Sequence, residues 1–79
     1  MKITWSEPIE VGSLQGDIRA IHGPSEALHC LAEAWPDRRG PFYVQARRFC
    51  RAAIDGRRTL EEAREMFISA AREARLNAH

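Results

Sequence analysis

Two glycine–proline pairs, at 23–24 and 40–41, are the features that most constrain how this chain folds. Proline is favoured at the first position of a helix, because its missing N–H has no intrahelical partner there, so each pair predicts a helix start. Pro36 ends the first helix, since the residue before a proline avoids helical geometry. Gly56 supplies the left-handed residue that ends a second helix of about 14 residues.

A third helix is predicted to begin at Thr59. Glu62 follows three positions later, so the "TLEE" run has the spacing of a capping box. Apolar residues then recur at helical spacing on one face: Leu60, Ala63, Phe67, Ala70, Ala71 and Ala74. Several of them are alanines, which let another helix approach closely, so we expect this helix to pack tightly against one of the other two.

The first 22 residues favour extended structure. Apolar and polar residues alternate from Ile3 to Val11, and the glycines of "VGSLQGD" reverse the chain into a second strand over 17–21. Pro8 lacks an N–H, so the first strand is either an edge strand or begins near Pro8. A two-stranded hairpin is not stable alone and needs helices to cover its apolar face.

These elements predict an α+β fold in which an N-terminal antiparallel β-hairpin packs on three α-helices, in the order β-β-α-α-α. A length of 79 residues fits one compact domain, 1–79, with fraying confined to 1–2 and 77–79. The hydrophobic fraction of 44% and charged fraction of 29% exclude the disordered and low-complexity classes.

The runs that carry the three helices resemble a small bacterial family, domain of unknown function 982. The resemblance lies in "WP" at 35–36, "YVQARRFCRAAIDG" from 43 and "TLEEAREMFISAAREA" from 59, and the positions that carry it are Ala46, Cys50, Ala53, Gly56, Ala63, Arg64, Phe67, Ala70 and Ala74. It covers most of the chain and is looser over the hairpin. It implies no activity, because none is established for the family.

Neither the cysteines nor the histidines show the spacing of a chemical site. Cys30 and Cys50 are in no metal-ligand motif, and the three histidines have no ligand spacing with them. No glycine-rich phosphate loop, Ser-His-Asp order or HExxH motif is present. We therefore expect a protein that is not an enzyme, with no catalytic residues, no cofactor and no metal.

Two expectations concern location. No apolar run approaches the roughly 20 residues of a membrane span, and the N-terminus lacks the basic and apolar segments of a secretory signal. The chain is thus expected to be cytoplasmic, with reduced thiols and no membrane partner.

Charge is distributed unevenly although the net charge is only +1. Residues 1–35 carry two basic against five acidic residues, whereas residues 36–60 carry seven arginines against two aspartates. Helical geometry places three of these arginines, Arg47, Arg48 and Arg51, opposite the apolar arc of the second helix. They are interpreted either as a solvated face, with Arg51 paired to Asp55 four residues on, or as a nucleic-acid contact.

The remaining arginines flank that helix. Arg57 and Arg58 follow its C-terminus, where the helix dipole favours positive charge. Arg38 and Arg39 precede its N-terminus, where the dipole opposes them, so with Gly40 they predict an anion site at the free backbone N–H groups. The structural alternative is a pairing of one of them with Asp37 or with the acidic hairpin.

The leading functional hypothesis is a protein-interaction or regulatory module. An acidic first half and a basic centre suit a protein partner or a second copy of the chain, as a homodimer. Tyr43 and Ile54, at the margin of the buried arc, and Ile68, off the apolar face of the third helix, are the expected contact residues. The alternative is an anion- or nucleic-acid-binding module that uses the arginines of residues 38–58.

Overall fold

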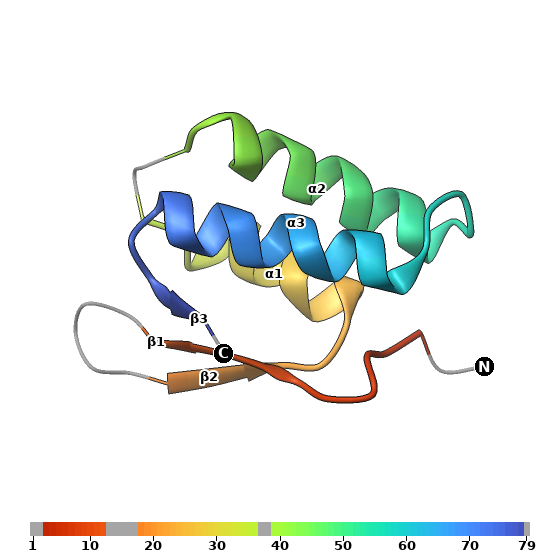
Figure 1. Ribbon diagram of the computed structural model, residues 1–79, viewed down its shortest axis with the longest axis horizontal. Helices are drawn as coiled ribbons and strands as arrows, with labels where there is room; N and C mark the ends of the chain where they lie inside the picture. The colour runs from red at the N-terminus through yellow and green to blue at the C-terminus, as the bar shows by residue number, and fades with distance from the viewer. Residues whose placement is uncertain (1–2, 13–17, 37–38, 79) are drawn as a thin grey trace.

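The computed structural model describes residues 3–12, 18–36 and 39–78, in which a small antiparallel sheet lies beneath three helices (Figure 1). The elements are β1 (Ile9–Gly12), β2 (Ile18–Ile21), α1 (Pro24–Glu33), α2 (Pro41–Ile54), α3 (Leu60–Glu73) and β3 (Asn77–Ala78). The predicted α+β fold with the order β-β-α-α-α is confirmed, and a short third strand follows it.

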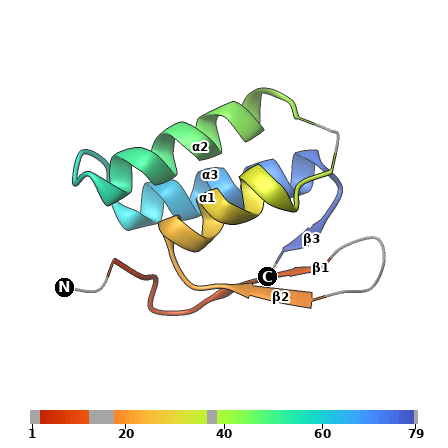
Figure 2. The same ribbon diagram turned by 180° about the vertical axis from the view of Figure 1, so that it is seen from behind.

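β1 is the central strand of the sheet, in the order β2-β1-β3. It pairs antiparallel with β2, with Ile9 opposite Ile21, and the side chains of Ile9, Val11 and Ile21 are buried beneath the helices. Val11 also lies opposite Ala78 of β3. The prediction that residues 77 and 78 fray is therefore wrong, because both pair with β1 as the chain returns from α3 (Figure 2).

The segment before β1 is held by Trp5. The strand predicted from Ile3 onward instead begins at Ile9, directly after Pro8, which has no N–H to donate. The Trp5 backbone N–H donates to the His22 carbonyl at 2.8 Å, and its indole Nε1 donates to the Leu60 carbonyl, also at 2.8 Å. One buried tryptophan thus ties the N-terminal segment to the start of α3.

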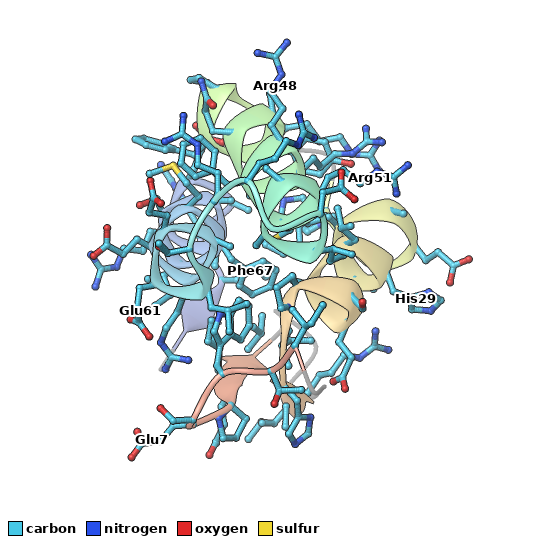
Figure 3. The ribbon with its side chains drawn as sticks, turned by 90° about the vertical axis from the view of Figure 1, so that its right-hand side faces the viewer. Glu7, His29, Arg48, Arg51, Glu61 and Phe67 are labelled. Atoms are coloured by element: carbon cyan, nitrogen blue, oxygen red, sulfur yellow. The ribbon has the colours of Figure 1, made fainter. Side chains whose placement is uncertain are left out.

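The helices form two layers above the sheet. Seen end-on, α1 and α3 lie over the strands and α2 lies above both (Figure 3). α2 runs antiparallel to the other two helices, so its N-terminus lies beside their C-terminal ends (Figures 1 and 2). Phe67 fills the space between the helices, fully buried, with its ring 6.4 Å from Trp5 and 5.6 Å from Trp35. The buried alanines of α2 and α3 let these two helices approach closely, as the sequence predicts.

The starts of the helices agree with the sequence signals. Pro24 and Pro41 occupy the first turns of α1 and α2. At α3 the Thr59 hydroxyl accepts from the Glu62 N–H at 3.1 Å, and the Glu62 carboxylate accepts from the Thr59 N–H at 3.0 Å. The predicted capping box is therefore present.

α2 and α3 end in the same way, with a Schellman motif that turns on one left-handed residue. In α2 that residue is Gly56, with φ 79°, and in α3 it is Arg75, with φ 60°. The closing bonds run from Gly56 N to Ala53 O (3.2 Å), from Arg57 N to Ala52 O (2.8 Å), from Arg75 N to Arg72 O (3.0 Å) and from Leu76 N to Ala71 O (2.8 Å). The second motif directs the chain from α3 into β3.

Glycine and arginine at these matched positions make a direct stability comparison. Left-handed geometry costs a residue with a Cβ about 1–2 kcal/mol, less the entropy that glycine loses on folding. We expect Arg75→Gly to raise the free energy of unfolding in urea by about 0.5–1 kcal/mol, and Gly56→Ala to lower it by about 1 kcal/mol. A loss of stability in Arg75→Gly would contradict the left-handed turn, because the Arg75 side chain is exposed.

Candidate functional site

The N-terminus of α2 is capped by a residue from another helix. The first N–H groups of a helix have no partner within it, and Gly40, at the N-cap position, has no side chain to supply one. The carboxylate of Glu73, the last residue of α3, accepts from the Phe42 N–H through Oε2 and from the Tyr43 N–H through Oε1, each at 3.2 Å. α3 therefore caps α2 with a negative charge, the sign that the helix dipole favours.

Gly40 makes room for this carboxylate. A Cβ at position 40 would lie 2.6 Å from both Cδ and Oε2 of Glu73, closer than such atoms can approach. The backbone at Gly40, with φ −89° and ψ −163°, is a conformation that other residues adopt readily. Space, rather than backbone geometry, is therefore what requires glycine here.

The helix start where Arg38, Arg39 and Gly40 were expected to bind an anion thus holds the chain's own carboxylate. Arg38 lies outside the described residues. Arg39 is exposed, and its guanidinium lies 5.2 Å from the centre of the Tyr43 ring. Two of the N–H donors that the hypothesis needed for an external anion are already used by Glu73.

Tyr43 joins the same end of α2 to α1. Its hydroxyl donates to the Leu31 carbonyl at 2.9 Å, in the last turn of α1, where carbonyls lose their helical partners. The Tyr43 ring also lies 6.2 Å from the ring of Trp35. The first turn of α2 therefore binds the C-terminal ends of both other helices.

The three residues predicted as an interaction patch do not share an exposed surface. Tyr43 is only 6% exposed, because its hydroxyl is engaged with α1, and so it is not at the margin of the buried arc as expected. Ile54 and Ile68 are half-buried, and Ile68 packs against the core. The exposed apolar side chains of α2 are instead Phe42 and Val44, at 43% and 46%.

Val44 lies in a groove between α1 and α2, which we call the α1–α2 groove. Its volume is about 500 Å³, and it is lined by Leu28 and Ala32 of α1 and by Tyr43, Val44, Arg47, Arg48 and Arg51 of α2. Sequence reasoning placed the three arginines on the outside of the helix but missed the groove, because its other wall comes from α1.

Arg47, Arg48 and Arg51, here called the arginine face, are exposed. Figure 3 shows Arg48 and Arg51 pointing away from Phe67 into the solvent. Within residues 3–12, 18–36 and 39–76, none of the three forms an ion pair. The arginine face therefore presents positive charge that these side chains do not neutralise by a close ion pair.

The arginines after α2 differ in this respect. Arg57 pairs with Asp55 at 3.1 Å, so the expected pairing of Asp55 with Arg51 is not the one formed. Arg58 pairs with Glu62 at 3.0 Å and lies 4.7 Å from the Phe49 ring centre. These contacts and the helix dipole account for both residues structurally.

The two thiols are buried and free. Burial raises the pKa of Cys50 to about 12. Burial also raises the pKa of Cys30, an effect that the nearby Arg19 guanidinium only partly opposes. Both thiols therefore remain protonated at neutral pH, the unreactive form.

Two other kinds of site were sought in the described part of the chain. No three side chains of His, Cys, Asp or Glu gather there as they would around a metal ion. Nor does any helix there have the length and apolarity needed to cross a bilayer.

Comparison with known proteins places the chain in a family. The model described as "Protein of unknown function (DUF982)" matches residues 7–78, and the chain belongs to this family, as its helical motifs predict. It is similar to Agrobacterium tumefaciens protein Atu1219, solved by NMR, with 34% identity over 92% of this chain and 73% of that chain and a TM-score of 0.80. No curated protein matches it. Functional inference therefore depends on the surfaces described above.

The cap on α2 can be tested by a double-mutant cycle. Glu73→Ala removes the carboxylate and Gly40→Ala displaces it, so we expect each to lower the free energy of unfolding by about 1–2 kcal/mol. Both changes break one interaction, and so Gly40→Ala should have little further effect in the Glu73→Ala background. Glu65→Ala, at an exposed position of α3, is the matched control. Additive losses would contradict the contact.

The Cys50 thiol predicts a loss of stability in alkali. Between pH 9.0, near which an unburied thiol ionises, and about 12, only the unfolded chain releases this proton. The free energy of unfolding should therefore be complete below pH 9.0 and fall as the pH rises through this window. Urea unfolding on both sides of pH 9.0 should show a shallower fall in Cys50→Ala than in the wild type. An equally steep fall in the variant would contradict the assignment.

Proposed function

We propose that this chain is a non-enzymatic protein-interaction module that binds its partner in the α1–α2 groove. The observation that carries the proposal is an apolar floor, formed by Leu28, Ala32 and Val44, bordered on one side by the arginine face. Apolar contact area with arginine beside it is a common composition for the centre of a protein interface. The exposed Val44 supplies an apolar contact that a partner would remove from water.

The described nucleophile candidates support a binding role rather than catalysis. Both thiols are buried and protonated, and the exposed histidines near them pair with glutamates of their own helical turn. His22 Nδ1 lies 3.0 Å from Glu26 Oε1, and His29 Nε2 lies 2.8 Å from Glu33 Oε2. A thiolate nucleophile needs a base within hydrogen-bond reach, and these imidazole nitrogens are directed to carboxylates. A reducing cytoplasm suits two free thiols and belongs to the same proposal.

Nucleic-acid binding is the second candidate, and one observation favours it. A second hollow, lined in part by Arg48, Arg51, Arg57 and Arg58, extends the basic surface towards the turn between α2 and α3. Such a strip suits phosphates. It is less well supported than protein binding, because Arg57 and Arg58 already pair with carboxylates and the groove beside the arginine face has an aliphatic floor.

Site-specific photo-crosslinking in cells that produce the full chain tests the proposal. A benzophenone amino acid at Val44 should yield a crosslink to one discrete protein, and Arg48→Glu in the same chain should reduce that crosslink. The same probe at Glu61, an exposed position that points away from α2 (Figure 3), is the matched control and should not yield it. Crosslinks to nucleic acid, or equal protein crosslinks from both positions, would overturn the proposal.

A further inference from the structure

We infer that the partner segment is an acidic amphipathic α-helix of another protein, with an apolar stripe bordered by carboxylates. The inference rests on the proposed function and specifies the chemistry that fits the α1–α2 groove. It follows from the spacing of the lining residues, from the sign of their charge, and from the position of the chain's own acidic side chains.

The lining residues follow helical spacing on both walls of the groove. On α2, Val44, Arg48 and Arg51 lie at i, i+4 and i+7, a stripe about 10 Å long, or two helical turns. On α1, Leu28 and Ala32 lie at i and i+4. A docked helix presents apolar residues at the same i, i+3 and i+4 intervals, so two of its turns can pack between the walls.

The charge on the groove selects the flanks of that helix. The arginine face lies on one side, and none of its members has a carboxylate partner among the residues for which side chains are described. Carboxylates placed one turn apart on the partner would meet Arg48 and Arg51, which are themselves one turn apart. Exclusion of water by the apolar contacts beside them strengthens such pairs relative to fully exposed ones.

A second copy of this chain fits the groove poorly. A two-fold contact centred on the groove brings one arginine face against the other, and like charges in an interface are repulsive. Glu61 lies on the far side of α3, away from the arginine face (Figure 3). A copy that offered this side would bind head to tail, an arrangement that does not close into a dimer. The charge distribution therefore favours a different, acidic protein.

Single-stranded nucleic acid fits less well for a separate reason. Proteins that bind it stack the bases on exposed aromatic rings. The aromatic residue of this groove, Tyr43, is buried with its hydroxyl on the Leu31 carbonyl. The remaining floor is aliphatic, which suits leucine-type side chains better than bases.

The test uses the full chain and synthetic peptides of about 18 residues, long enough for five helical turns. The probe peptide carries leucines at i, i+3, i+4 and i+7 with glutamates beside them. One control peptide has the same composition in shuffled order, and another has lysines in place of the glutamates. Binding is measured by fluorescence anisotropy, and the site is mapped by amide chemical shifts.

We expect only the ordered acidic peptide to bind, with shifts at α1 and α2 and an affinity that falls as salt is raised. Arg48→Glu and Val44→Asp should each weaken binding at least about tenfold, since they alter the charge and the floor. Arg72→Glu makes the same charge change at an exposed position of α3 outside the groove and should leave binding unchanged. Circular dichroism confirms that each variant is folded.

Two results would overturn the inference. Equal binding of ordered and shuffled peptides would show that charge alone acts, and absent binding of the ordered peptide would show that the groove takes another occupant. If the probe at Val44 still crosslinks a discrete protein in cells, only the helix inference fails and the proposed function stands. If an oligonucleotide of equal charge binds more tightly than the ordered peptide, both fail.

Discussion

The arrangement of the three helices depends on the carboxylate of Glu73 at the start of α2. α2 begins at a glycine that cannot cap it, and the Glu73 carboxylate supplies two acceptors from the end of α3. Tyr43, in the same turn, bonds to the end of α1. Because α2 lies above α1 and α3, away from the sheet (Figure 3), these contacts help fix its position over both. The α1–α2 groove is a consequence of that position.

The helices were predictable because their signals are local. A proline at each of two starts, a capping box at Thr59 and a glycine after α2 each act within one turn, so the sequence shows them directly. β3 was missed for the opposite reason. It has two residues, too few to show an alternating pattern, and it forms because the left-handed turn at Arg75 returns the chain to β1.

The candidate site was only partly predictable. Helical angles placed the arginine face on the outside of α2, since that depends on spacing alone. They placed Tyr43 too near the surface, because its burial depends on a hydroxyl contact with another helix. The sequence also indicated an anion at the start of α2 but not that Glu73, about thirty residues away, provides a carboxylate there. Glycine at position 40 is a signal for that contact only once the packing of α3 is known.

Hydrogen exchange at the Phe42 and Tyr43 amides measures the central contact most directly. First-turn amides of a helix lack intrahelical acceptors and exchange readily unless something else binds them. With Glu73 bound to both, they should exchange more slowly than the unbonded first-turn amides of α1, and Glu73→Ala should remove the difference. Exchange at unprotected rates in the wild-type chain would contradict the account, because α2 would then lack the contact that attaches it to α3.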